Sequence, residues 1–261
     1  MPVSFSDLAI GLSKLGLTNH LVIAHASLKA FGSIEGGADT MLSALLDSVR
    51  GVIMPTFTYK TMLNPDVGPP RNGITYGSQT DLNKMAESFY PDMPADKTMG
   101  ILPETLRKHP KAKRSSHPIQ SFAGIHADAV LNTQSIYNPL APIGLLADSD
   151  GWVLLLGVDH RVNTSIHYAE KLGGRLQFIR WALVHDRVME CPGFPGDSEG
   201  FNAIEPLVEK YTRHVEIGGA FVRAIHLKSL INVVLEKLTE NPYVLLCTRP
   251  DCERCNAVRY G

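Results

Sequence analysis

His167 and Glu170 are the residues whose types and spacing best suit acid–base chemistry. They are three residues apart, so in a helix they lie on one face and the imidazole can touch the carboxylate. A carboxylate that holds one ring nitrogen leaves the other free to accept a proton from a substrate. Such pairs also occur on ordinary amphipathic helices, so the pair needs support from the rest of the chain.

The neighbouring sequence predicts how this pair is positioned. Trp152–Leu156 (WVLLL) is an apolar run typical of a buried strand. Asn163, Thr164 and Ser165 are residue types that cap helix N-termini, so we expect a helix to begin there. A strand, a polar loop and a His-x-x-Glu helix form a plausible support for a general base.

The remaining pattern predicts an α/β fold in one domain, residues 1–261. We expect a central mixed sheet flanked by helices on both faces, with a strand-rich C-terminal portion. The segment Tyr59–Thr98 is rich in Pro and Gly and too long for a plain connection, so we expect it to cover a cleft. The predicted strands are Leu21–Ala26, Gly51–Thr58, Leu176–Val184, Arg187–Cys191, Ala220–Leu227 and Tyr243–Cys247. The predicted helices are Phe5–Leu15, Ala38–Val49, Asp81–Tyr90, Gly100–Lys108, His126–Val130, Glu199–Tyr211 and Ser229–Lys237, with a loop at Pro139–Leu146.

The composition is that of a globular protein. The chain has 261 residues, 44% hydrophobic and 20% charged, with a formal net charge of -1. This charge gives no basic footprint for nucleic acid. We find neither an apolar run long enough for a membrane span nor a secretory signal pattern, so we expect a cytoplasmic protein.

Three of the four cysteines form a C-x4-C-x2-C pattern at Cys247, Cys252 and Cys255. One interpretation is a zinc site completed by Cys191 or a histidine. The other is reduced thiols in a cytosolic protein. Because only one C-x2-C is present and no second ligand pair has matching spacing, we expect no metal.

Several stretches together resemble the aminoglycoside 3-N-acetyltransferase family, also called the antibiotic N-acetyltransferase family. They occur in the family's order from about residue 21 to residue 175: HASLKAFG followed by GGAD, VIMPTFT, PDMPADKTMGILPETLRK, RSSHPIQSFAGI and VLLLGVDHRVNTSIHYAE. The tail CTRPDCERCNAVR is similar to the family's C-terminus. The R/Q-x-x-G-x-G/A loop of the widespread GNAT fold is absent from the sequence, so we do not expect that fold.

The resemblance implies acetyl-CoA as donor and the 3-amino group of a 2-deoxystreptamine antibiotic as acceptor. It places His167 as general base, oriented by Glu170. It implies that the N-terminal half is mainly the coenzyme side and the C-terminal half contributes to the acceptor side. The residues that fall on the family's coenzyme-side motifs are Ser27, Leu28, Arg114, Ser115, Ser121 and Phe122. In RSSHP, Ser116 stands in the motif's variable slot.

The chemistry agrees with this assignment. An aliphatic amine is largely protonated at pH 7, and a neutral His167 could remove the proton so that the amine attacks the thioester directly. A backbone N–H or a hydroxyl near Asn163–Ser165 could stabilise the oxyanion. An acyl-enzyme route through a cysteine is less favoured, because all four cysteines lie outside the matched motifs. We interpret two alternative histidines, His25 and His117, as supporting or structural.

A polycationic antibiotic calls for an acidic acceptor pocket. The candidates are Asp66, Asp92, Glu199 and Glu205, with Asp159 also available, and for each of them a solvated surface position is the alternative. Two other functions stay open: a CoA-dependent acetyltransferase acting on a non-antibiotic amine, and a CoA- or metal-binding protein without catalysis. We expect a monomer or a homodimer.

Overall fold

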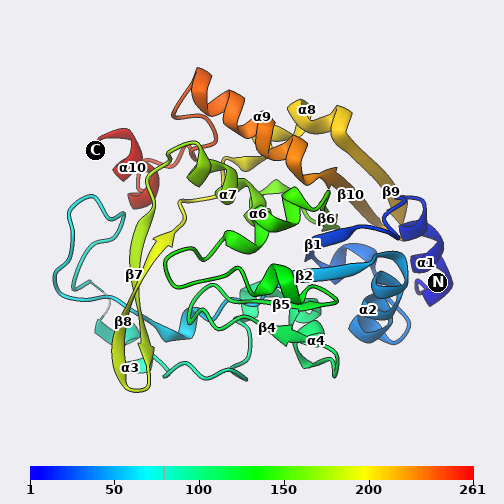
Figure 1. Cartoon of the computed structure of the whole chain (residues 1–261), viewed down its shortest axis with the longest axis horizontal. Coiled ribbons are helices and arrows are strands. Elements are labelled where there is room, and N and C mark those ends of the chain that lie inside the picture. Colours follow the sequence, from blue (N-terminus) through cyan, green and yellow to red (C-terminus); the bar gives the residue numbers. More distant parts are fainter. Residues whose placement is uncertain (79) are drawn as a thin grey trace.

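The computed structural model describes residues 1–78 and 80–261 and contains a large mixed sheet beside a small antiparallel one. The large sheet has seven strands in the order β4-β5-β2-β1-β6-β10-β9 (Figure 1). These strands are β4 (Lys113–Arg114), β5 (Phe122–Ile125), β2 (Gly51–Pro55), β1 (Leu21–Ala26), β6 (Trp152–Leu156), β10 (Ala220–His226) and β9 (Thr212–Ile217).

Three parallel strands form the middle of this sheet. β1 pairs in parallel with β2 and β6, in registers that place Leu21 opposite Gly51 and Ala26 opposite Leu156. The outer neighbours β5 and β10 are antiparallel. β1, β2 and β6 are apolar runs with almost no exposed residue, as expected for strands that are covered on both faces.

Helices cover both faces of the sheet and bury two separate hydrophobic clusters. Neighbouring residues on β1 point to opposite sides, so Ile23 joins one cluster and Val22 the other. The sequence-based fold class is therefore confirmed. One face carries α1 (Phe5–Ser13), α2 (Gly37–Ser48) and α4 (Ile101–Lys108). The other carries α5 (Asp128–Leu131), α6 (Ala141–Asp148), α7 (Thr164–Leu172) and α9 (Leu227–Glu240).

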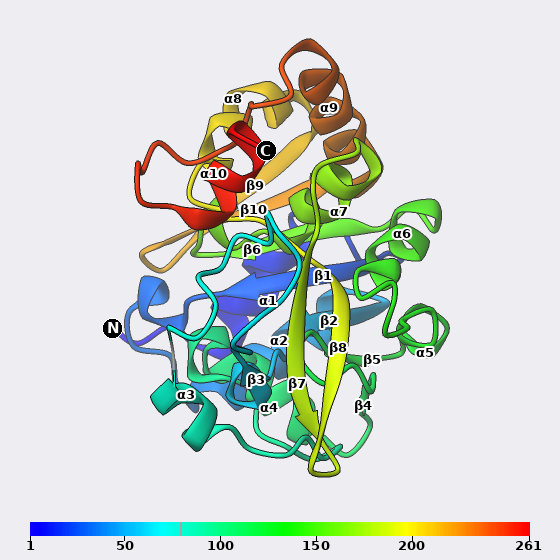
Figure 2. The same cartoon turned by 90° about the vertical axis from the view of Figure 1, so that its left-hand side faces the viewer.

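The small sheet consists of a long hairpin and a short strand from the Pro- and Gly-rich segment. β7 (Phe178–Val184) and β8 (Arg187–Phe194) form the hairpin, and β3 (Met62–Leu63) pairs with β7 (Figure 2). The turn residues His185 and Asp186 both have positive φ, which suits the twist of a tight hairpin. The segment that contains β3 also forms α3 (Thr80–Met85), shorter than the predicted helix.

Three predicted elements are wrong. Pro139–Leu146 was expected to be a loop, but α6 begins at Ala141 because Pro142 stands in its first turn, where no backbone donor is lost. Tyr243–Cys247 is irregular rather than a strand, with Leu245 at a positive φ. The helix predicted at Glu199–Tyr211 is broken into short turns around α8 (Glu205–Val208).

The elements that were not predicted include the two-residue strands β3 and β4, the edge strand β9 and the C-terminal helix α10 (Glu253–Arg259). β9 carries mostly polar side chains, as an edge strand often does, so it gave no apolar signal. None of the described helices is both long and apolar enough to cross a bilayer.

Candidate active site

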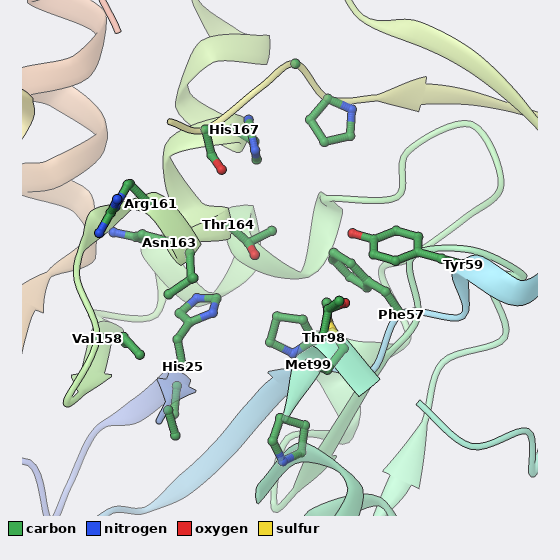
Figure 3. A pocket seen from close by; sticks show the side chains of 18 of the residues that line it. His25, Phe57, Tyr59, Thr98, Met99, Val158, Arg161, Asn163, Thr164 and His167 are labelled. Atoms are coloured by element: carbon green, nitrogen blue, oxygen red, sulfur yellow. The ribbon is translucent and has the colours of Figure 1, made fainter. Parts of the chain in front are cut away.

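A cavity of about 330 Å³ lies beyond the carboxyl ends of β1, β2 and β6 (Figure 3). Open α/β sheets commonly bind ligands at this edge. The segment predicted as a cover contributes its two ends, Tyr59 and Thr98. The residues that line the cavity are Ala24, His25, Ala26, Pro55, Phe57, Tyr59, Thr98, Met99, Pro103, Val158, Arg161, Val162, Asn163, Thr164, His167, Phe194, Pro195, Gly196, Ser198 and Arg254.

His167 reaches this cavity from α7, the helix that follows β6. The side chain of Asn163 caps the helix by accepting a hydrogen bond from the backbone N–H of Ser165 at 3.1 Å. The predicted strand, polar loop and helix are therefore confirmed as the support of this histidine. Thr164 and His167 project from the same side of α7, with Phe57 and Tyr59 facing them across the cavity (Figure 3).

The predicted contact between His167 and Glu170 is present. Nδ1 of His167 lies 3.0 Å from Oε2 of Glu170, and the carboxyl group is only 2% exposed. The other oxygen of Glu170 lies 3.5 Å from Nε of the buried Arg175. In the tautomer that carries its proton on Nδ1, His167 can donate this proton to the carboxylate, which leaves the lone pair of Nε2 available.

Packing fixes the plane of the His167 ring. The ring of Phe201 meets it edge-on, with the two centroids 4.6 Å apart. Phe201 itself is fully buried in the core. The imidazole is therefore held in orientation by a charged partner on one side and an aromatic ring on the other, as a general base requires.

Two further buried histidines lie at or beside the cavity. His25 lines it from the end of β1, and its Nε2 has no hydrogen-bond partner among the described residues. Burial, together with the neighbouring His160, lowers the pKa of His25 to about 3. Burial lowers the pKa of His160 to about 4, and its Nδ1 lies 3.2 Å from the side-chain nitrogen of Asn163. Both rings are neutral at pH 7.

The third candidate histidine, His117, does not belong to the cavity lining. Its Nδ1 accepts backbone hydrogen bonds from Ile119 and Gln120, at 3.1 and 2.9 Å. Burial lowers its pKa to about 4. The ring fixes the turn that leads into β5, in agreement with the structural role expected from the sequence.

The residues predicted on the coenzyme side fall in two places. Ser27 and Leu28 directly follow β1, next to the cavity-lining residue Ala26, and both are half-buried. Arg114 and Ser121 lie behind the cavity wall. The guanidinium of Arg114 donates to the carbonyl oxygen of Thr56 at 2.7 Å, to Oγ of Ser121 at 3.0 Å and to the carbonyl oxygens of Pro91 and Met93.

Ser115, directly after β4, and Phe122, the first residue of β5, also lie behind this wall. The backbone N–H of Phe122 donates to Oγ of Ser115 at 2.8 Å, and the ring of Phe122 is fully buried against Phe57. Ser115 thus contacts Phe122, Ser121 contacts Thr56 directly after β2, and none of the three is among the residues that line the cavity. Their assignment to the coenzyme stays a prediction.

The four predicted acidic residues are not gathered in one place. Asp92 pairs with Arg107 at 3.1 Å, and Asp66 is exposed in the segment between β3 and α3. Glu205 pairs with Arg223 at 2.7 Å. Glu199 directly follows Ser198, which lines the cavity.

The charges at the cavity differ from the acidic pocket predicted from the sequence. Among the described residues, those that line the cavity include no Asp or Glu, and they include Arg161 and Arg254. The guanidinium of Arg161 lies 2.8 Å from a carboxylate oxygen of Asp159 and 3.9 Å from one of Glu199. Two carboxylates therefore lie beside this arginine. Neither arginine was predicted as a site residue, although both lie in stretches that resemble the family: Arg161 in VLLLGVDHRVNTSIHYAE and Arg254 in CTRPDCERCNAVR.

The cysteines do not offer a nucleophile at His167. Cys191 is buried in β8, and burial raises the pKa of its thiol to about 12. Cys247, Cys252 and Cys255 gather around Asp197. The structure therefore corrects the fourth member predicted for this group, which is neither Cys191 nor a histidine.

Comparison with known proteins shows which family the chain is similar to. The model of the aminoglycoside 3-N-acetyltransferase family matches residues 23–239. Aminoglycoside N(3)-acetyltransferase VII from Streptomyces paromomycinus is 35% identical over 183 residues, which cover 66% of this chain and 61% of that enzyme. The matched part of this chain thus spans less than two thirds of the length of this relative.

Solved structures share the fold along almost the whole chain. The crystal structure of the apoenzyme of aminoglycoside acetyltransferase AAC(3)-IVa has a TM-score of 0.80 and 23% identity, covering 99% of this chain and 98% of that one. A His-to-Ala mutant of that enzyme, solved in complex with a gentamicin, has a TM-score of 0.78, 22% identity and coverage of 99% and 97%. AAC-IIIb, solved as a binary complex with CoASH, has a TM-score of 0.73, 23% identity and coverage of 92% and 97%.

The three buried histidines should make the fold sensitive to acid. In the unfolded chain these rings take up protons below about pH 6.5, whereas the folded protein leaves them neutral down to about pH 4. The free energy of unfolding therefore falls as the pH drops from 6.5 to 4.5, by up to about 1.4 kcal/mol for each pH unit and ring. We expect the melting temperature, measured by circular dichroism, to fall across this window. His117→Gln should reduce the slope, and the exposed His214→Gln should not. An unchanged melting temperature would contradict the buried neutral rings.

Proposed function

The chain belongs to the aminoglycoside 3-N-acetyltransferase family, and on that premise we propose that it transfers the acetyl group of acetyl-CoA to the 3-amino group of a 2-deoxystreptamine aminoglycoside. The observation that carries this proposal is the His167–Glu170 pair, 3.0 Å apart at the edge of the cavity. The relatives support it, since one was solved with a gentamicin and another with CoASH.

His167 acts as the general base in this proposal. Its Nε2 removes a proton from the substrate ammonium, and the freed amine attacks the acetyl carbonyl directly. The C–N bond forms, the C–S bond breaks, and the histidine returns a proton to the departing CoA thiolate. Glu170 positions the ring and stabilises the imidazolium, because its buried carboxylate contacts Nδ1.

Thr164 is our candidate for stabilising the oxyanion. It lies one helical turn before His167, on the same face of α7, and both side chains line the cavity (Figure 3). Its hydroxyl can donate a hydrogen bond to the carbonyl oxygen as negative charge develops there. This choice narrows the set Asn163–Ser165, since the side chain of Asn163 caps the helix and that of Ser165 is fully buried.

The cavity suits the reactive end of acetyl-CoA. Phe57, Tyr59 and Met99 offer an apolar wall for a narrow aliphatic arm, and Arg161 and Arg254 offer positive charge to an anionic ligand. We propose that the coenzyme passes Ser27 and Leu28 at the end of β1. Arg114 and Ser121 hold the backbone of Thr56, and so keep the lining residues Pro55 and Phe57 in place.

The charged side chains that line the cavity favour one alternative function. A polycationic antibiotic gains little from Arg161 and Arg254, so an acetyl transfer to a less cationic amine, with the same base and donor, is the alternative function. A panel that contains gentamicin, apramycin and simple amino sugars separates the two. Turnover only with the amino sugars would exclude the antibiotic as the acceptor and would keep acetyl transfer as the reaction.

Replacing His167 by Ala should lower kcat by about a hundredfold or more, because the amine loses its base. Glu170→Gln should cost about tenfold to a hundredfold, because the ring loses its charged partner. The measurement is thiol release from acetyl-CoA with gentamicin and with the rest of the panel. The matched control is His214→Ala, which removes an exposed histidine that lies 3.7 Å from a glutamate, Glu209. Equal turnover by His167→Ala and the wild type would exclude the proposed base.

Thr164→Val should lower kcat by about a hundredfold, because the side chain keeps its shape but cannot donate to the oxyanion. Thr164→Ser keeps the hydroxyl and should restore most of the activity. The KM values should change little if the contact forms mainly in the transition state. If both variants were equally active, the hydroxyl would have no part in the reaction.

Arg114→Lys should lower the free energy of unfolding by about 1–3 kcal/mol, because lysine cannot replace the hydrogen bonds that the guanidinium donates to three backbone carbonyls. Denaturant unfolding measures this, and the KM for acetyl-CoA should stay nearly constant. A stable variant with a strongly raised KM for acetyl-CoA would instead place Arg114 on the coenzyme.

A further inference from the structure

Four ligand-type side chains meet at one point in the C-terminal part of the chain. The sulfur atoms of Cys247, Cys252 and Cys255 and a carboxylate oxygen of Asp197 all lie within 4.8 Å of one another, and all four residues are buried. Asp197 follows the end of β8, and the cysteines lie around the start of α10, so the group joins two distant segments. We propose that these residues bind a structural zinc ion.

The geometry suits a tetrahedral site. Zinc is usually bound at about 2.3 Å from thiolate sulfur, which places the sulfurs about 3.8 Å apart, so the ligands need to move only slightly inward. None of the three cysteines is in a disulfide, and an odd number of thiols cannot be paired completely within the group. With four protein ligands the site is closed, which is typical of structural rather than catalytic zinc.

The surrounding charges complete the site. Three thiolates and one carboxylate around a divalent ion leave a net charge of about −2, which is costly to bury without cations. Two arginines supply them: Arg249 and Arg254 donate to Oδ2 of Asp197 at 2.9 and 3.3 Å. Such outer partners orient the ligands of a metal site and balance its charge.

Few buried side chains other than the cysteines anchor the segment that carries them. In residues 241–261 the buried side chains are Leu245 and the three cysteines. The cysteines form a hydrophobic cluster of their own, with Leu246 packed against it. A structural zinc ion contributes folding free energy where an apolar core is too small to do so.

The site also supports the wall of the cavity. Arg254 lines the cavity and donates to the carbonyl oxygen of Gly196 at 3.1 Å as well as to Asp197. Pro195, Gly196 and Ser198 line the cavity next to this aspartate. A metal ion bound here would hold in place two segments that line the same cavity as His167.

The first experiment is to measure zinc in the full-length protein, purified under reducing conditions, by elemental mass spectrometry. We expect one zinc per chain. After removal of the metal by a chelator, titration with cobalt should give the strong visible bands and thiolate charge-transfer bands of a tetrahedral, sulfur-rich site. A protein without zinc that also gives no such cobalt spectrum would overturn the proposal. This result needs no substrate, so it is independent of acetyl transfer.

Variants test the ligand assignment. Cys252→Ala and Cys255→Ala should lose the zinc, and Asp197→Asn should bind it more weakly while keeping the thiolate bands. The matched control is Cys191→Ala, which removes the one buried cysteine outside the group and should keep one zinc per chain. Full zinc content in Cys252→Ala and Cys255→Ala would refute the assignment. If those variants do not fold, the melting temperature of the wild type with and without chelator decides, since loss of a structural ion should lower it.

Discussion

The buried carboxylate of Glu170 is the constraint around which the site is built. A carboxylate that is 2% exposed is stable in its charged form only with partners, and it has two, His167 at 3.0 Å and Arg175 at 3.5 Å. Arg175 is itself buried and donates to the carbonyl oxygen of Val244 at 2.6 Å. The orientation of the histidine is therefore tied to α7, to the chain that enters β7 and to the segment after α9.

The parallel centre of the sheet determines what faces this pair. Because β1, β2 and β6 run in the same direction, the loops that follow them meet at one edge, and each contributes part of the cavity wall. β1 contributes His25, the chain after β2 contributes Phe57, and the loop after β6 leads to α7. The end of the hairpin β7–β8 adds Phe194 to the lining, followed by Pro195 and Gly196.

Much of this could be predicted from the sequence where one local pattern decides the outcome. The strands Leu21–Ala26 and Trp152–Leu156 are continuous apolar runs, and their predicted bounds agree with the structure. The His167–Glu170 contact follows from helical spacing alone. Arg254 at the cavity and Asp197 beside the cysteines could not be predicted, because they depend on contacts between segments far apart in the chain. The polar edge strand β9 has no periodic apolar signal, and α10 is short and buries Cys255 alone among its residues.

The span of the cavity lining has a consequence for the order of folding. The wall brings Ala24 and Arg254 together with residues from many segments between them. Contacts at such long separations cost loop-closure entropy before they are rewarded, so they form late relative to local helices and hairpins. The site is thus a property of the completed topology: a chain can contain α7 and its histidine well before it has a pocket in which that histidine can act.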